Sequence, residues 1–100
     1  MTTPDIVQIT LNRAADRIAE RGWWNGCNGE EVGEEALCAQ LAIAEEVAIH
    51  RPTYNAVMEE LSFRITGKHL EDKGKRFVVI TEWNDSRSSV DEVLRVMRGQ

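Results

Sequence analysis

In the stretch EALCAQLAIAEEVAIH, residues 35–50, only Gln40 interrupts the apolar residues between Ala36 and Ala44. One stripe at helical spacing contains Leu37, Leu41, Ala44 and Ala48, and it is widened by Cys38, Ile43, Val47 and Ile49. A helix that is apolar on nearly all sides is normally buried. Its alanines also let neighbouring helices approach closely. We therefore expect residues 35–50 to form the central helix of the fold.

The segment before it, TTPDIVQITLNRAADRIAERG (residues 2–22), predicts an amphipathic helix. Thr3 is the expected N-cap, and Pro4 suits the first helical position, where its missing N–H costs nothing. The inward stripe consists of Val7, Leu11, Ala14 and Ile18. Gly22 is expected to end the helix in the left-handed conformation.

Two further helices are predicted after Pro52, which is expected to stop the central one. The first would be capped by Thr53 and end at Gly67, with an inward face of Tyr54, Val57, Met58, Leu61 and Ile65. The charged segment 68–76 predicts a loop or a short turn of helix. The last helix begins at a capping box formed by Ser89 and Glu92, and it turns Val90, Val93, Leu94 and Met97 inward.

The run FVVIT, residues 77–81, is apolar and β-branched and predicts an extended segment. A single strand needs a partner. The segment should therefore either pack as extended chain over the helices or pair with its copy in a homodimer. The predicted fold is mainly α, a compact bundle of about four helices with one short extended segment. No repeat or linker divides the chain, so residues 1–100 should form a single helical domain.

The formal charge of −5 argues against general nucleic-acid binding, which requires a basic face. No apolar run approaches the roughly 20 residues of a membrane span. The N-terminus, MTTPDIVQIT, lacks the basic and apolar regions of a secretion signal. The sequence therefore predicts a cytoplasmic protein that binds neither nucleic acid nor membrane, with Cys27 and Cys38 as reduced thiols.

Three tryptophans stand at predicted corners of the fold. Trp23 directly follows the first helix, and Trp83 ends the extended segment. Both are expected to be structural anchors, because a large ring can plug a corner while its indole N–H meets a carbonyl or water. Asn84 and Asp85 are expected to form a turn beside Trp83 and to belong to the same group of structural anchors.

Trp24 differs from these anchors because its neighbour Trp23 already points inward. We expect Trp24 to point outward within the glycine-rich stretch RGWWNGCNGEE, residues 21–31. An exposed tryptophan in a polar loop is typical of a binding hot spot. The sequence therefore predicts a partner-binding surface formed by Trp24, Asn25 and Cys27.

Residues that could support catalysis or bind a metal are few and far apart. The cysteines and histidines, Cys27, Cys38, His50 and His69, lack the short spacing of paired zinc ligands. The glutamate pairs Glu30-Glu31, Glu34-Glu35, Glu45-Glu46 and Glu59-Glu60 lack the spacing of a calcium loop and indicate a solvated surface. We therefore expect no catalytic residue, no metal site and no cofactor.

Three groups of residues carry a resemblance to a known family: Gly22-Trp23, LCAQLAIAEE (37–46) and ITEWNDSRSSVDEVLRVM (80–97). Together they resemble a family of short, uncharacterised proteins from actinobacteria and their phages. The shared order is an alanine-rich helix, a Gly-Trp corner, a Cys-containing helix, and Trp-Asn-Asp followed by a short capped helix. The resemblance covers most of the chain outside residues 50–76. It implies an origin and a helical fold, and it implies no catalytic residue.

Two functional classes follow from these observations. The favoured class is a non-catalytic interaction protein, such as a phage or prophage accessory protein that binds a host protein in the host cytoplasm. The alternative is a small enzyme or metal-dependent module that uses Cys27, His50, His69 or the glutamate pairs. A small-molecule binder is a third class that the sequence leaves open.

Overall fold

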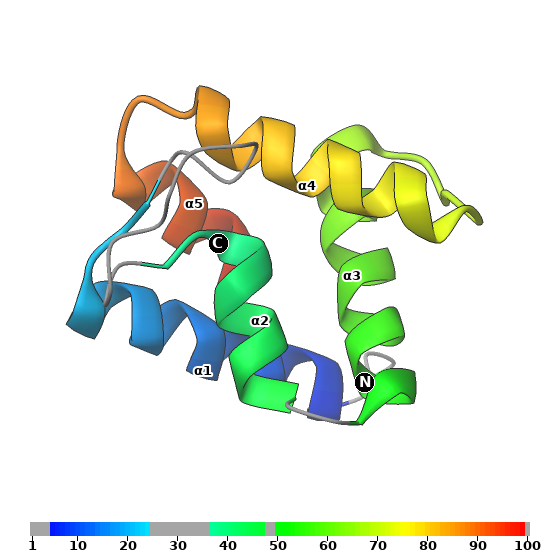
Figure 1. The fold of residues 1–100 in the computed structure, drawn as a ribbon, viewed down its shortest axis with the longest axis horizontal. Helices are drawn as coiled ribbons and strands as arrows, with labels where there is room; N and C mark the ends of the chain where they lie inside the picture. The colour runs from blue at the N-terminus through cyan, green and yellow to red at the C-terminus, as the bar shows by residue number, and fades with distance from the viewer. Residues whose placement is uncertain (1–4, 25–36, 48–49, 100) are drawn as a thin grey trace.

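The computed structural model describes residues 5–24, 37–47 and 50–99. Their regular elements are the helices α1 (Asp5–Arg21), α2 (Ala39–Val47), α3 (Arg51–Thr66), α4 (Lys73–Ser86) and α5 (Val90–Met97). In Figure 1, α1 crosses one side of α2 and α4 crosses the other, while α3 runs between α1 and α4. Helix α5 packs on α1 and α3. The fold is mainly α, as expected, with five helices in these residues where the sequence predicted about four.

The first helix follows the sequence prediction closely. Val7, Leu11, Ala14 and Ile18 are all buried in the common core. The helix ends at Arg21, and the Gly22 N–H donates to the Ile18 carbonyl at 2.8 Å. Gly22 has φ 103°, a conformation that side-chain-bearing residues rarely adopt. The predicted glycine end of this helix is therefore confirmed, while the expected cap at Thr3 lies outside the described residues.

Helix α2 contacts α1, α3 and α4, which agrees with its predicted central position. It is shorter than expected, however, because Leu37 pairs its backbone with the corner that follows α1. Its buried positions also differ from the predicted stripe. Ala39, Ala42 and Ile43 are fully buried, whereas Leu41 and Ala44 are only half-buried. The face of α2 that packs on the core is therefore the one that carries Ala39, Ala42 and Ile43, and the predicted stripe through Leu41 and Ala44 lies at its edge.

Helix α3 begins earlier than the sequence predicted. His50 is its N-cap, and the ring Nδ1 accepts from the Thr53 N–H at 3.3 Å. Pro52 thus lies in the first turn, where a proline needs no hydrogen-bond donor, and Thr53 is not the cap. The predicted end at Gly67 is confirmed, with φ 75° and an N–H that donates to the Phe63 carbonyl at 2.7 Å.

The predicted extended segment 77–81 is wrong, because these residues lie inside α4. Asp72 caps this helix by accepting from the Lys75 N–H at 3.1 Å. Ile80, Thr81 and Asn84 then recur at helical spacing and are all fully buried or nearly so. Burial of this face outweighs the modest preference of β-branched residues for strands. A homodimer paired through a strand at 77–81 therefore loses its structural basis.

The last helix is placed correctly by the sequence, but its cap is not. Ser89 stands at the N-cap position and makes no side-chain capping bond. The neighbouring Ser88 hydroxyl instead donates to the Glu92 carboxylate at 2.7 Å. Val93 and Met97 are fully buried, as the helical spacing predicted. No helix in the described part of the chain is long and apolar enough to cross a membrane.

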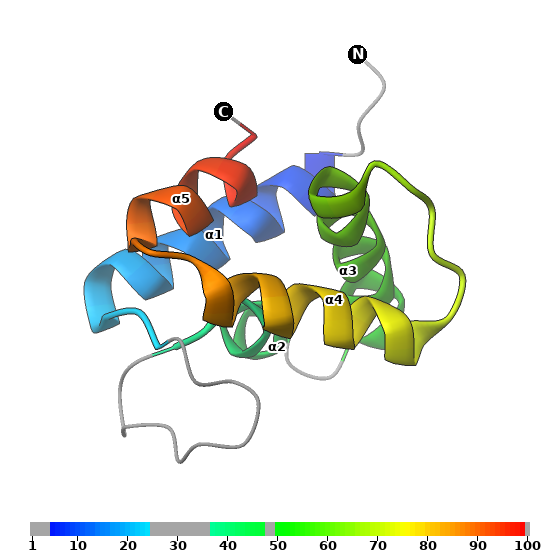
Figure 2. The same ribbon diagram turned by 90° about the horizontal axis from the view of Figure 1, so that it is seen from above.

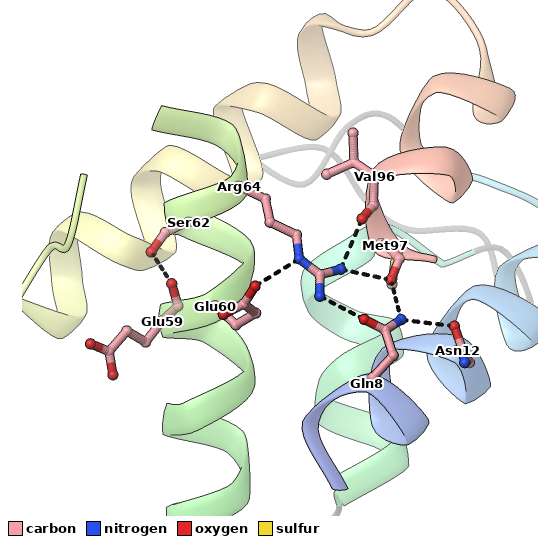
Figure 3. Close-up of polar contacts among 8 residues, drawn as sticks. All are labelled: Gln8, Asn12, Glu59, Glu60, Ser62, Arg64, Val96 and Met97. Atoms are coloured by element: carbon pink, nitrogen blue, oxygen red, sulfur yellow. Dashed lines mark hydrogen bonds and ion pairs between the residues drawn. The ribbon is translucent and has the colours of Figure 1, made fainter. Parts of the chain in front are cut away.

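Arg64 of α3 joins three helices at the C-terminal end of α5 (Figure 3). Its Nη1 donates to the carbonyls of Val96 at 3.0 Å and Met97 at 3.1 Å. Its Nη2 donates to the Gln8 side-chain oxygen on α1 at 2.6 Å, and its Nε pairs with Glu60 at 2.9 Å. A cation at a helix C-terminus satisfies carbonyls that lack helical partners. This contact holds the short α5 against α1 and α3.

We expect Arg64→Met to destabilise the fold by about 2–3 kcal/mol, because hydrogen bonds to a charged group are each stronger than neutral ones. Arg64→Lys should destabilise the fold less than Arg64→Met, because it keeps the positive charge. It should still be less stable than the parent protein, because an ammonium group cannot reproduce the several directed hydrogen bonds of the planar guanidinium group. Urea unfolding of both variants measures the change. Arg95→Ala, which removes an exposed cation from α5, is the control. Equal stability of Arg64→Met and the parent protein would remove the proposed role of this contact.

Candidate functional site

Two of the sequence-predicted anchors, Trp23 and Asp85, are hydrogen-bonded to a third, the buried side chain of Asn84 on α4. Its Oδ1 accepts from the Trp23 indole N–H at 2.9 Å and from the Ala39 backbone N–H at 3.1 Å. Its Nδ2 donates to the Trp24 carbonyl at 2.9 Å and to the Asp85 carboxylate at 3.2 Å. The turn expected at Asn84 and Asp85 is wrong, because both residues lie within α4.

The backbone of the Gly-Trp corner is held beside the start of α2 by a short parallel bridge between Trp23 and Leu37. The Leu37 N–H donates to the Gly22 carbonyl at 2.9 Å, and the Trp24 N–H donates to the Leu37 carbonyl at 2.9 Å. The Trp23 ring packs against the core from a half-buried position. The partly buried Trp83 also packs against the core. This corner is therefore a structural junction between α1, α2 and α4.

Trp24 was expected to be exposed and to point outward, but it is half-buried, and its indole nitrogen is enclosed without an acceptor among the described residues. An enclosed N–H without a partner is unfavourable. Asn25 and Cys27, the other predicted partner-binding residues, lie outside the described part of the chain. Cys38 is fully buried and disulfide-bonded, so the expectation of a reduced thiol at this position is wrong.

The histidines named as candidates for chemistry each have a local structural partner. His50 caps α3 and contacts the Thr53 hydroxyl at 2.5 Å. The ring of His69 stacks on Phe63 with centroids 4.5 Å apart, and its Nδ1 lies 3.8 Å from a Glu59 oxygen. Within residues 5–24, 37–47 and 50–99, no three His, Cys, Asp or Glu side chains gather as metal ligands would.

Glu45 and Glu46 of α2 pair with arginines of α1. Arg17 Nε lies 2.9 Å from Glu46, and its Nη1 lies 3.1 Å from Glu45, which Arg21 also contacts at 2.6 Å. The hydrogen bond that Arg17 donates to the Glu46 carboxylate raises the pKa of Arg17 above its ordinary value. Both carboxylates therefore face guanidinium groups, and the exposed pairs of Glu45 contribute little to stability.

Among the described residues, large apolar side chains are exposed on α1 (Ile6 56%, Ile9 44%) and on α4, and of these only the pair on α4 lines hollows beside α3. Phe77 is 41% exposed and Val78 is 47% exposed. Phe77 shares the face of α4 that buries Ile80 and Asn84, because it precedes them by three and seven residues. Figures 1 and 2 show the N-terminal turns of α4 reaching past the axis of α3. The core-facing side of α4 therefore continues beyond the core.

Three adjoining hollows surround this end of α4, and we call them together the α3–α4 surface. One of about 250 Å³ is lined by Tyr54, Asn55, Met58, Lys73, Gly74, Arg76 and Phe77. A second of about 370 Å³ shares Tyr54, Asn55 and Lys73 and adds Ala44 and Arg51. A third of about 490 Å³ adjoins the first at Gly74 and is lined also by Leu70, Asp72, Lys75, Val78 and Val79. Apolar walls thus alternate with cationic side chains.

Sequence reasoning missed the α3–α4 surface, although a signal for it was present. The run FVVI places apolar residues on every side of a helix. Only part of such a helix can face the core of a small domain. Once residues 73–86 are recognised as helical, the excess apolar positions Phe77 and Val78 indicate a second contact surface.

The model of a family of unknown function (DUF6197) matches residues 2–99, so the chain belongs to this family. Comparison with curated proteins found no match. Comparison with solved structures found none either.

Proposed function

We propose that this member of a family of unknown function is a non-catalytic interaction protein that binds a protein partner through the α3–α4 surface. The observation that carries the proposal is the exposure of Phe77 and Val78 beside three adjoining hollows. Exposed apolar side chains with a polar rim are typical of protein-binding sites. The candidate chemical groups on the described residues are instead occupied as caps, ring stacks or ion pairs.

The proposed setting is an actinobacterium or its phage, with the chain acting as an accessory protein on a host protein. This setting rests on the resemblance of Gly22-Trp23, residues 37–46 and residues 80–97 to proteins of that origin. The proposed location is the cytoplasm, which is the host cytoplasm if the chain is phage-encoded. The disulfide at Cys38 weighs against it, because disulfides are rare in that compartment. Thiol labelling of the chain denatured directly from intact cells tests the location, because denaturation exposes the buried Cys38 to the reagent. An oxidised Cys38 there would contradict the cytoplasmic location.

We expect Phe77→Ser with Val78→Ser to abolish capture of the partner from an actinobacterial lysate and to leave the fold intact. Both side chains are more than one third exposed, so their loss costs the folded state little. Mass spectrometry of the captured proteins and circular dichroism measure the two effects. Ile6→Ser is the matched control, because Ile6 is an apolar residue that is 56% exposed and lines none of the three hollows. It belongs to α1, which lies on the other side of α2 from α4 in Figure 1. Unchanged capture by the α4 double variant would contradict the proposal.

Trp24, with Asn25 and Cys27, remains a second proposed contact for the same partner. Trp24→Ala tests it in the same capture experiment. Loss of capture with an unchanged melting temperature would support a binding role for this ring. Loss of stability as well would make the ring part of the structural junction around Asn84.

A further inference from the structure

We propose that the partner presents an acidic segment with a large apolar side chain to the α3–α4 surface. This inference rests on the proposed function and specifies the chemistry of the partner. The apolar side chain would contact Phe77 in the hollow between α3 and α4, and the carboxylates would face the surrounding cations.

The charge of the α3–α4 surface is opposite to that of the whole chain. The chain carries a formal charge of −5. The side chains lining the three hollows include four cations, Arg51, Lys73, Lys75 and Arg76, against one carboxylate, Asp72. That carboxylate is engaged as the cap of α4 through the Lys75 N–H. Glu71 is exposed nearby but lines none of these hollows. The surface therefore concentrates positive charge on an acidic protein.

The cations of this surface are also available to a ligand. Among the described residues, Arg51, Lys73 and Lys75 make no ion pair, and all three are exposed. By contrast, Arg17 and Arg21 of α1 are each paired with a glutamate of α2. Arg76 donates through Nε to the Leu70 carbonyl, which holds its guanidinium beside the apolar hollow. Complementary charges at the rim of an interface raise the association rate and select the partner.

The apolar part of the surface is suited to one large side chain. Phe77 from α4 faces Tyr54 and Met58 from α3 across the hollow of about 250 Å³. The rings offer a large rigid apolar area, and the flexible methionine side chain can adapt to an inserted apolar group. On the other side of Gly74, Val78 and Val79 line the hollow of about 490 Å³. An acidic segment with a leucine or phenylalanine would therefore bury apolar area and pair its carboxylates in one contact.

The test uses the full chain and a short synthetic peptide in which glutamates flank a leucine–phenylalanine pair. Amide shifts in NMR spectra should locate the peptide at residues 51–58 and 73–79. Phe77→Ser should weaken its affinity by about tenfold or more, the loss expected for an apolar anchor of an interface. Lys73→Glu with Lys75→Glu should weaken it by a similar factor and remove much of its dependence on salt. Arg95→Glu, a charge reversal on the exposed face of α5, should change the affinity little.

Two comparison peptides separate the chemistry of the partner from the existence of the site. A peptide with lysines in place of the glutamates should bind at least about tenfold more weakly, and so should one with serines in place of the apolar pair. If the lysine peptide bound as tightly as the glutamate peptide, the inference that the partner is acidic would be wrong. The proposed function would still stand if capture of the partner from the lysate continued to depend on Phe77. Preferential occupation of the same residues by a second copy of the chain, an oligonucleotide or anionic vesicles would also overturn the inference.

Discussion

Ile43→Asp is expected to leave the protein unfolded under conditions in which the parent chain is folded. Ile43 is fully buried on α2, within the core cluster that also contains Leu11, Val57 and Ile80. An aspartate there would lose its hydration and find no cationic partner in an apolar core. The cost of several kcal/mol is comparable with the roughly 5–15 kcal/mol that stabilises a domain of this size. Circular dichroism during thermal unfolding measures the effect.

Leu41→Asp is the informative control on the same helix. Leu41 is half-buried, so a carboxylate at this position can retain contact with water. The loss of folding stability should therefore be clearly smaller for Leu41→Asp than for Ile43→Asp. Ile43→Val, which removes one methylene group, should cost only about 1 kcal/mol. A larger loss for Leu41→Asp than for Ile43→Asp would show that α2 turns its other side to the core.

Asn84→Ala is expected to destabilise the fold by about 3–5 kcal/mol, the second largest effect. The substitution would leave the Trp23 indole N–H, the Ala39 N–H and the Trp24 carbonyl without their partner. Each buried polar group that loses its hydrogen bond costs about 1–3 kcal/mol. Because Asn84 is fully buried, water cannot replace all of these bonds. Chemical denaturation with tryptophan fluorescence measures both the stability and the environment of the corner.

Asn55→Ala provides the matched control for Asn84→Ala. Asn55 is half-buried on α3, and its side chain makes no hydrogen bond within the described residues. Its removal should change the stability by no more than about 0.5 kcal/mol. If Asn84→Ala were equally mild, the hydrogen bonds around Asn84 would not hold the Gly-Trp corner to α4.

The sequence by itself predicted the helices whose apolar residues recur on one face. In α1 the stripe ending at Ile18 and the terminal Gly22 are both found as expected. In α5 the buried pair Val93 and Met97 follows from the same periodicity. These signals are local: the spacing of the side chains and the freedom of a glycine act within a few turns of the chain.

The tertiary structure alone decided three features that depend on contacts between distant residues. Residues 77–81 became helical because Ile80 and Asn84 are buried together on one face of α4. Leu37 left the central helix because its backbone pairs with the corner at Trp23. Phe77 remained exposed because α4 continues past α3, although its helix face points toward the core. In the first two cases the deciding energy comes from burial or hydrogen bonds across the fold, which local propensity is too weak to oppose. In the third, the continuation of α4 past α3 decides which of its residues reach the core.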